Sequence, residues 1–319
     1  MTLYPSLLCL LASVIRWLSQ VDSSINLALV SGELYLWGCN RYNQLDPFGK
    51  IHAPKAARSI RSPLKISFDC LKAVNDRIVS CSAGAHHSAI LTEKGRVAVW
   101  GDPRFGVLGP LCDHSKEKSS ITWFGPADFD GKRVVSLSSG WSHLAALTEC
   151  GDIFTWGRGH LGCLGHLDPT CPDFCSSLTE QAKPQVTTQV NPHLIATHPR
   201  QILFPHRTGD DHCLPLPVPQ IPSTSCHQLA CGSEHCLALD TTGCLWAWGW
   251  NEHGMCGNSD RKEGQQTSSG AFPNNCIWHP VPVSFCEVSS PSDVEDKKFF
   301  LPLGLVSAGY GHSFATVRA

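Results

Sequence analysis

The sequence predicts an all-β fold, a β-propeller of about four blades plus a half blade, and a recurring motif is the main reason. The motif is Gly-x-x-His followed at a fixed distance by Trp-Gly, and it recurs along the chain. Each copy contains two stretches of alternating apolar residues separated by a glycine-containing turn, which is typical of a β-hairpin. Repeated units that bury their faces only against their neighbours are typical of propeller blades.

The spacing within the motif is constant in the three complete copies. Each histidine precedes its tryptophan by 13 residues, in the pairs His87 and Trp100, His143 and Trp156, and His235 and Trp248. A shorter copy comes first, at residues 26–38, where Asn26 stands in place of the histidine, and a half copy follows at residues 308–316. We expect the recurring tryptophan to fill the core between blades.

The motif resembles the repeat of the regulator of chromosome condensation family, whose signature joins Gly-x-x-His to Trp-Gly-x-x-x-x-Gly-x-Leu-Gly. Residues 139–143 with 154–158, and above all residues 231–235 with 248–257, carry the resemblance, which covers about residues 20–319. Propellers of that family have seven blades. The resemblance therefore implies that this chain corresponds to a C-terminal part, and forms an incomplete seven-blade ring.

An incomplete ring predicts an open arc rather than a closed propeller. The strand predicted at residues 305–317 then has no partner unless residues 1–37 supply one. Apolar blade faces near Trp37 and Phe314 would be exposed, and exposed patches of that kind favour association. We therefore expect the chain, expressed alone, to aggregate or form oligomers.

The sequence divides into an apolar segment at residues 1–20 and propeller repeats at residues 21–319. The apolar run at residues 7–18 lacks a preceding basic residue and is too short to span a membrane. We expect it to form a strand or short helix of the first blade, with a secretory signal as the alternative. A long loop insertion at about 168–226, rich in proline, threonine and cysteine, and a shorter polar insertion at about 259–275 interrupt the repeats.

Composition excludes a nucleic-acid-binding protein that depends on phosphate contacts. The 319 residues carry a formal net charge of −2, and no basic tail or basic face is evident. The 17 cysteines are irregularly spaced and odd in number, which favours free thiols in a reducing compartment over a disulfide framework. We expect a cytoplasmic protein, with the nucleus as a second location.

No catalytic constellation is evident, so we expect no catalytic residue. The motif histidines recur once per blade, which favours a structural imidazole bonded to a neighbouring backbone group over a shared active site. Residues 157–162 match Gly-x-Gly-x-x-Gly, but a further glycine and Pro169 follow where a dinucleotide site needs a helix. We therefore expect no cofactor.

One local group of cysteines and histidines could hold zinc by ligand type. Its members lie within 16 residues, and they are His160, Cys163, His166, Cys171 and Cys175. Their spacings fit no zinc knuckle or finger, and two of them fall on repeat positions. We expect surface side chains on a loop and no metal site.

The resemblance implies a guanine nucleotide exchange factor or another regulator of a small GTPase, linked to secretion. Exchange factors need no catalytic side chain, because they act by binding the nucleotide-free GTPase better than the loaded one. The alternative is a non-catalytic interaction scaffold, since the same repeats occur in proteins of other functions. An enzyme with a propeller active site ranks last, and the partner expected is a protein.

The loops that follow each Trp-Gly are the predicted partner-binding surface. They occupy the same point of each repeat but differ in chemistry, as loops that carry specificity would. The residues are Asn40, Arg41, Asp102, Arg104, Arg158, His160, Asn251 and Glu252. The alternative is that these side chains are only polar surface residues of the rim and bind no partner.

Overall fold

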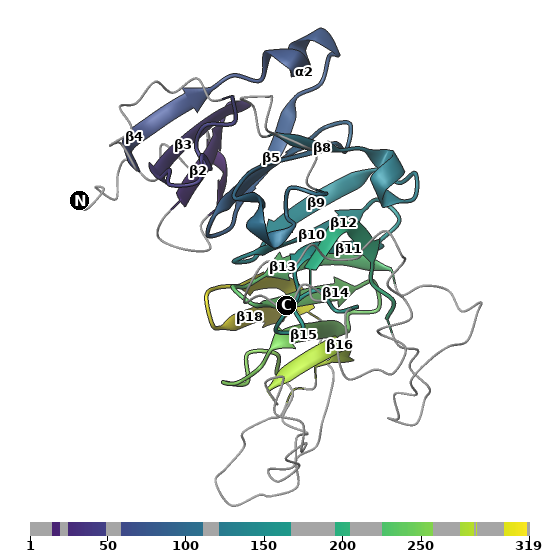
Figure 1. Ribbon diagram of the computed structural model, residues 1–319. Coiled ribbons are helices and arrows are strands. Elements are labelled where there is room, and N and C mark those ends of the chain that lie inside the picture. The colour runs from purple at the N-terminus through teal and green to yellow at the C-terminus, as the bar shows by residue number, and fades with distance from the viewer. Residues whose placement is uncertain are drawn as a thin grey trace, which may run out of the picture.

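The computed structural model describes a partial ring of successive antiparallel sheets (Figure 1). The described residues are 15–19, 25–48, 59–110, 121–166, 195–204, 225–257, 275–283, 285 and 303–317. They form four sheets of four strands and one sheet of two strands. The predicted all-β fold of four blades plus a half blade is confirmed.

The strands follow one another within each blade in chain order. Blade 1 contains β1 (Ile15–Ser19), β2 (Ile25–Val30), β3 (Glu33–Cys39) and β4 (Ser59–Ile66). Blade 2 contains β5 (Ile78–Ala83), β6 (His87–Thr92), β7 (Val97–Gly101) and β8 (Thr122–Phe124). Blade 3 contains β9 (Val134–Ser139), β10 (His143–Thr148), β11 (Ile153–Arg158) and β12 (Ile195–Gln201). Blade 4 contains β13 (Cys226–Cys231), β14 (His235–Asp240), β15 (Leu245–Trp250) and β16 (Cys276–Pro282), and the half blade contains β17 (Leu303–Ala308) and β18 (Ser313–Val317).

Short helices connect some of these strands. They are α2 (Asp69–Ala73), η1 (Pro103–Phe105) and η2 (Pro126–Phe129). Among the described residues, no helix is long and apolar enough to cross a membrane.

The constant spacing of the motif follows from the hairpin register. Each motif histidine pairs across the hairpin with the glycine of Trp-Gly, in the pairs His87 with Gly101, His143 with Gly157, and His235 with Gly249. Gly249 has a φ of +110°, and a Cβ there would lie 2.5 Å from the carbonyl oxygen of Glu234. Only glycine fits such a position without strain. In blade 1 the residue opposite Gly38 is Ile25, so the structure corrects our assignment of Asn26 to the histidine position.

The tryptophans of the motif join neighbouring blades. Trp100, Trp156 and Trp248 are fully buried, and each indole Nε1 donates to a carbonyl oxygen in the loop of the preceding blade. The acceptors are Gln44 at 2.8 Å, Val107 at 3.0 Å and Cys163 at 3.0 Å. At each interface a large apolar ring fills the space between blades, and its one hydrogen-bond donor has a partner. This confirms the prediction that the tryptophan fills the core between blades.

A chain of backbone hydrogen bonds links the Gly-x-x-His turns of successive blades. The amide of Ala85 donates to Trp141 at 3.0 Å, the amide of Trp141 to Ser233 at 2.7 Å, and the amide of Ser233 to Tyr310 at 3.4 Å. The first strands β1, β5, β9, β13 and β17 also contact one another in succession. The first strands therefore form the inner wall of the arc.

The predicted long insertion at 168–226 is divided by a strand. β12 is the fourth strand of blade 3, and Ile202 just beyond it is buried, with its amide bonded to the carbonyl of Ile153 at 2.8 Å. The remainder of this insertion and almost all of the predicted insertion at 259–275 lie outside the described residues. β1 lies in the predicted apolar segment at 1–20 and pairs with β2, as expected for a strand of the first blade.

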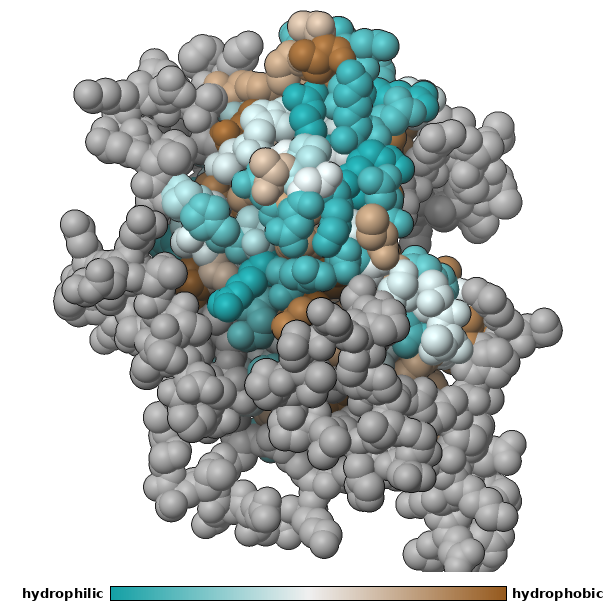
Figure 2. Space-filling view, turned by 90° about the vertical axis from the view of Figure 1, so that its right-hand side faces the viewer, coloured by the Kyte–Doolittle hydropathy of each residue, from teal (hydrophilic) through white to brown (hydrophobic). Residues whose placement is uncertain are grey.

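The half blade has large apolar side chains on its surface. Phe314 is 61% exposed, Leu305 is 58% exposed and Val317 is 50% exposed, whereas Trp37 in blade 1 is half-buried. By contrast, the side face of the molecule in Figure 2 is mostly hydrophilic where residues are described, with hydrophobic atoms in small separate groups. The expected apolar exposure is therefore found at the half blade.

Candidate functional site

The loops after Trp-Gly are anchored at equivalent points of the blades. The amide of Asp102 donates to the carbonyl of His86 at 2.9 Å, and the amide of Arg158 donates to that of Ser142 at 2.9 Å. In blade 4 the amide of Trp250 makes the same bond to Glu234 at 2.8 Å. These three loops therefore leave their blades beside the Gly-x-x-His turn, which places the predicted partner-binding residues of blades 2, 3 and 4 at the same end of their blades.

Two of the predicted partner-binding residues shape their own loops. The side-chain oxygen of Asn40 accepts from the amide of Leu45 at 2.9 Å, and that of Asn251 accepts from the amide of Cys256 at 2.9 Å. Such bonds between asparagine and nearby backbone satisfy the turn. Asn40 and Asn251 thus hold the loop conformation in blades 1 and 4.

Asp102 and Arg104 form an ion pair within one loop. The Asp102 side chain is only 2% exposed, and Arg104 Nε lies 2.9 Å from both of its carboxylate oxygens. The hydrogen bond to Asp102 raises the pKa of the Arg104 guanidinium above its usual range. The Arg104 side chain remains 57% exposed, so the pair fixes a cation at the surface.

Arg104 belongs to a continuous group of aromatic and basic side chains, which we call the rim row: Tyr42, His86, Arg104, Phe105 and Arg158. The guanidinium of Arg104 lies 4.8 Å from the Tyr42 ring centroid, and that of Arg158 lies 5.3 Å from the Phe105 centroid. The His86 ring contacts Tyr42 at 4.9 Å between centroids. The rim row therefore joins the loops of blades 1, 2 and 3.

The remaining predicted residues lie outside the rim row. Arg41 and Glu252 are exposed. His160 is half-buried, and burial together with the charge of Arg158 lowers the pKa of its imidazole to about 4. Sequence reasoning missed Tyr42, His86 and Phe105, although two of them are aromatic residues in the loops that it had selected.

The motif histidines His87, His143 and His235 are buried, but two of them bond to side chains rather than to the backbone groups that we expected. A Cβ on Gly140 would lie 1.9 Å from the His143 ring, so the glycine of Gly-x-x-His makes room for the imidazole. His143 Nε2 lies 3.2 Å from Cys236 Sγ, and His235 Nε2 lies 3.0 Å from Ser313 Oγ. These two histidines therefore bond to side chains of the next blade.

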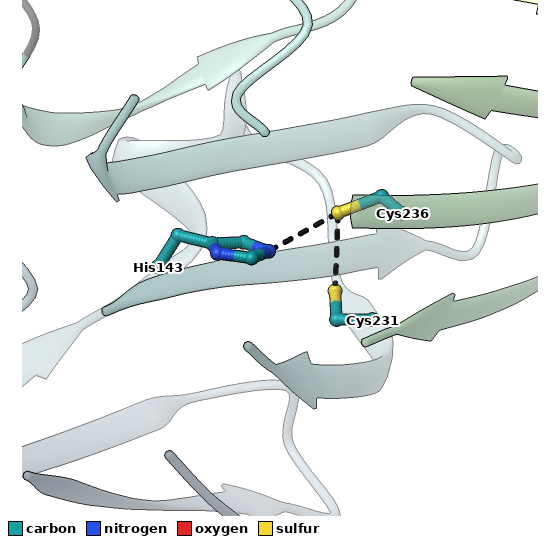
Figure 3. Close-up of side chains that lie close together, drawn as sticks. All are labelled: His143, Cys231 and Cys236. Atoms are coloured by element: carbon teal, nitrogen blue, oxygen red, sulfur yellow. Dashed lines mark hydrogen bonds between the residues drawn. The ribbon is translucent and has the colours of Figure 1, made fainter. Parts of the chain in front are cut away.

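A buried cluster of thiols surrounds His143 at the interface of blades 3 and 4. Cys236 Sγ lies 3.4 Å from Cys231 Sγ, so that both sulfurs and the His143 ring converge (Figure 3). Cys163 and Glu234 also offer ligand atoms within 4.8 Å of His143 and of each other. These are the described residues that could hold a metal ion.

The cluster corrects our expectation for Cys163. It is fully buried, not a surface side chain on a loop, and its thiol donates to the carbonyl of Arg158 at 2.9 Å. Of the local group considered from sequence, Cys163 lies with His143 from another strand. Cys171 and Cys175 lie outside the described residues.

The ionisable groups of the cluster shift one another's pKa values. Burial opposes ionisation of Cys231, but its hydrogen bonds with Cys236 and His143 lower the pKa of its thiol. Burial and the bond with Cys231 raise the pKa of the Cys236 thiol. Burial also disfavours the charged imidazole of His143, but the thiols of Cys163 and Cys231 outweigh it and raise the pKa of His143.

Comparison with known proteins relates this geometry to curated relatives. The chain is 29% identical over 288 residues to the secretion-regulating guanine nucleotide exchange factor of Bos taurus, an alignment covering 90% of this chain and 50% of the relative. It is 33% identical over 245 residues to the Mus musculus protein of the same name, covering 76% and 42%. The chain thus spans about half the length of these relatives.

A solved structure and a repeat profile complete the comparison. The crystal structure of Prp20p from Saccharomyces cerevisiae, described together with its binding properties to Gsp1p and histones, superposes with a TM-score of 0.61 at 20% identity. It covers 95% of this chain and 56% of Prp20p, a likeness that concerns the fold alone. Two profiles of the regulator of chromosome condensation (RCC1) repeat match residues 31–91 and 242–316, and residues 78–107 and 226–254. The chain therefore belongs to the regulator of chromosome condensation (RCC1) repeat family.

Proposed function

We propose that this chain acts on a small GTPase, as a guanine nucleotide exchange factor or another regulator linked to secretion, and that it binds its partner through the rim row. The observation that carries the proposal is the row itself, in which Arg104 of blade 2 lies over Tyr42 of blade 1, and Arg158 of blade 3 lies over Phe105 of blade 2. The similarity to relatives named as secretion-regulating exchange factors supports the class of partner.

The chemistry of the rim row suits a protein partner with acidic groups. Arginine and aromatic side chains contribute a large share of binding energy in protein interfaces, and the planar guanidinium binds carboxylates through paired hydrogen bonds. Arg104 is held in place by the buried Asp102, so little side-chain entropy is lost when it binds. Exchange would follow if this surface bound the nucleotide-free GTPase more tightly than the loaded form.

The test is nucleotide release from a panel of small GTPases loaded with a fluorescent guanine nucleotide. We expect the chain to accelerate release from one member by about tenfold or more, which corresponds to about 1.4 kcal/mol of preferential binding. Unchanged release and undetectable binding across the panel would refute the proposal. Binding without faster release would identify the interaction scaffold, the second candidate function.

A charge variant tests the binding surface. Reversal at Arg104 would place a second carboxylate against buried Asp102 and disturb the fold, so we combine Arg41→Glu with Arg158→Gln, which both remove positive charge from the rim. This variant should weaken partner binding at unchanged urea stability. The matched control is Lys72→Glu on α2, an exposed charge away from the rim. Equal affinity of both variants for the partner would show that these loops do not form the binding surface.

We further propose that the protein acts in the cytoplasm, with the nucleus as a second location. The proposal rests on the cysteine usage of the sequence, which favours a reducing compartment. Imaging of a tagged chain checks it, and accumulation in the secretory pathway would contradict it.

A further inference from the structure

The interfaces between blades repeat one arrangement of four positions. Two belong to the first blade, namely the motif histidine and the residue seven positions after the motif tryptophan. Two belong to the next blade, namely the residue before the motif glycine and the residue after the motif histidine. Between blade 4 and the half blade these positions hold His235, Met255, Ala308 and Ser313.

This last interface shows what the fold itself requires. His235 Nε2 lies 3.0 Å from Ser313 Oγ, and Ser313 Oγ donates to the carbonyl of Met255 at 2.6 Å. Ser88 makes the equivalent bond to Gln44 at 2.7 Å between blades 1 and 2. One hydroxyl therefore completes the arrangement, and no thiol is needed.

Between blades 3 and 4 the same positions hold His143, Cys163, Cys231 and Cys236. Cys236 makes the same two contacts that Ser313 makes at the last interface. Its Sγ lies 3.2 Å from His143 Nε2 and 3.5 Å from the Cys163 carbonyl oxygen. Between blades 2 and 3 the corresponding residues are His87, Val107, Ser139 and Leu144. Three thiols thus gather beside one imidazole only at the interface of blades 3 and 4, among those compared.

We propose that this interface binds one thiophilic metal ion, with Zn²⁺ as the probe, through Cys231, Cys236 and His143. Thiolate and imidazole are the ligands that zinc prefers in structural sites. A tetrahedral site with ordinary Zn–S and Zn–N bonds has edges of about 3.8 Å between sulfurs and about 3.6 Å between sulfur and nitrogen. The observed 3.4 Å and 3.2 Å are shorter by only a few tenths of an ångström.

The fourth position is assigned to Cys163, which belongs to a second group of possible ligands that shares His143 with the first group. Its sulfur, a His143 nitrogen and a Glu234 oxygen lie within 4.8 Å of one another. Cys163 is fully buried, as are the other three ligands, so the ion would be shielded from water. Glu234 Oε2 is buried without a hydrogen-bond partner among the described residues, and it could accept from ligand or water beside the ion.

A disulfide between Cys231 and Cys236 is the rival explanation. These residues face each other across the β13–β14 hairpin, but their sulfurs lie 3.4 Å apart, far beyond a bond of about 2.05 Å. A disulfide would also leave His143 and Cys163 without a role in the cluster. A bound metal ion would have all four residues as ligands.

The test compares metal content between the full chain and a variant built from the neighbouring interface. Cys163→Met, Cys231→Ala and Cys236→Ser together install the residues that occupy these positions beside His235. The variant interface then has the same residues as the interface between blade 4 and the half blade, and the blades should still pack. Both reduced proteins are equilibrated with Zn²⁺, gel-filtered and measured by mass spectrometry for elements. We expect about one more zinc ion per chain in the unmodified protein. Equal zinc contents in the two proteins would overturn the proposal.

Cobalt gives a readout that depends on the ligands rather than on stability. Co²⁺ in the unmodified chain should show the visible bands of a tetrahedral ion and a thiolate-to-cobalt charge-transfer band, both absent from the triple variant. Cys226→Ser, which removes a buried thiol outside the cluster, should leave these bands unchanged. Loss of the bands in this control, or their persistence in the triple variant, would place the ion elsewhere and refute the assignment.

Discussion

At the scale of the residue, the buried imidazole of His87 should make the stability of the fold depend on pH. His87 is 1% exposed, and its Nε2 has no hydrogen-bond partner within the part of the chain described. Burial, reinforced by the nearby His143, lowers the pKa of His87 to about 3. In the unfolded chain the same group has a pKa of about 6.5.

The stability of the fold should therefore decrease as the pH falls below 6.5, because the unfolded chain takes up the proton first. For His87 alone the free energy of unfolding should drop by about 2 kcal/mol between pH 7.5 and pH 5. His87→Ile, which copies Ile25 at the same position of blade 1, removes this contribution. Urea unfolding at both pH values measures the difference, and an equal drop in the variant would contradict the prediction.

Sequence reasoning predicted the motif residues but not the thiol cluster. The histidines and tryptophans are separated by a constant distance within one hairpin, so their pattern is visible along the chain. Cys231 and Cys236 face each other within one hairpin, but they lie beside His143 of blade 3 only because two blades pack together. Local spacing along the chain does not indicate that packing. Superposing the repeats position by position could have found them, because each cysteine occupies a repeat position filled by another residue elsewhere.

At the scale of the element, the tryptophan of each third strand ties one blade to the previous one. Trp156 on β11 packs against Phe124 of β8 with 5.3 Å between ring centroids, and its Nε1 bonds to Val107 at 3.0 Å. Both the ring and the bond cross the interface of blades 2 and 3.

Trp156→Phe should lower the free energy of unfolding by about 1–3 kcal/mol. The substitution keeps an aromatic ring but leaves the Val107 carbonyl without its donor in a buried place. Trp141→Phe, at a half-buried ring beside Tyr310, serves as the control and should cost clearly less. Comparable losses in the two variants, measured by urea unfolding, would show that the inter-blade bond contributes little.

The strands that sequence reasoning found and missed differ in their apolar pattern. β10 and β14 are buried at every position and lie within the recurring motif, so their hairpins were predicted. β12 reads Ile-Ala-Thr-His-Pro-Arg-Gln and is half-buried at most, so its strand signal is weak and its proline argues against a strand. It forms because β11 offers a free edge, which is tertiary context rather than local propensity.

At the scale of the whole molecule, most of the exposed large apolar side chains among the described residues lie in the half blade. Leu305, Tyr310, Phe314 and Val317 are each at least half exposed on β17, β18 or the turn between them. A strand with unpaired edge groups and exposed apolar side chains tends to pair with another chain.

These 319 residues should therefore self-associate in a concentration-dependent way. Leu305→Thr with Phe314→Ser should reduce the association, whereas Val135→Thr, a change at an exposed apolar residue of β9, should not. Sedimentation velocity measures the effect. A monomer at all concentrations, with the β18 amides protected from hydrogen exchange, would show that this strand is covered and that the ring closes.

The backbone bonds from Ala85 through Trp141 and Ser233 to Tyr310 connect blade 2 to blade 3, blade 3 to blade 4, and blade 4 to the half blade. A linear array of this kind has nearest-neighbour cooperativity, so its outermost units open at lower free energy than its central ones. Heating should then melt the array progressively from its two ends. In calorimetry the van't Hoff enthalpy would fall short of the calorimetric enthalpy, because no single transition involves every blade at once.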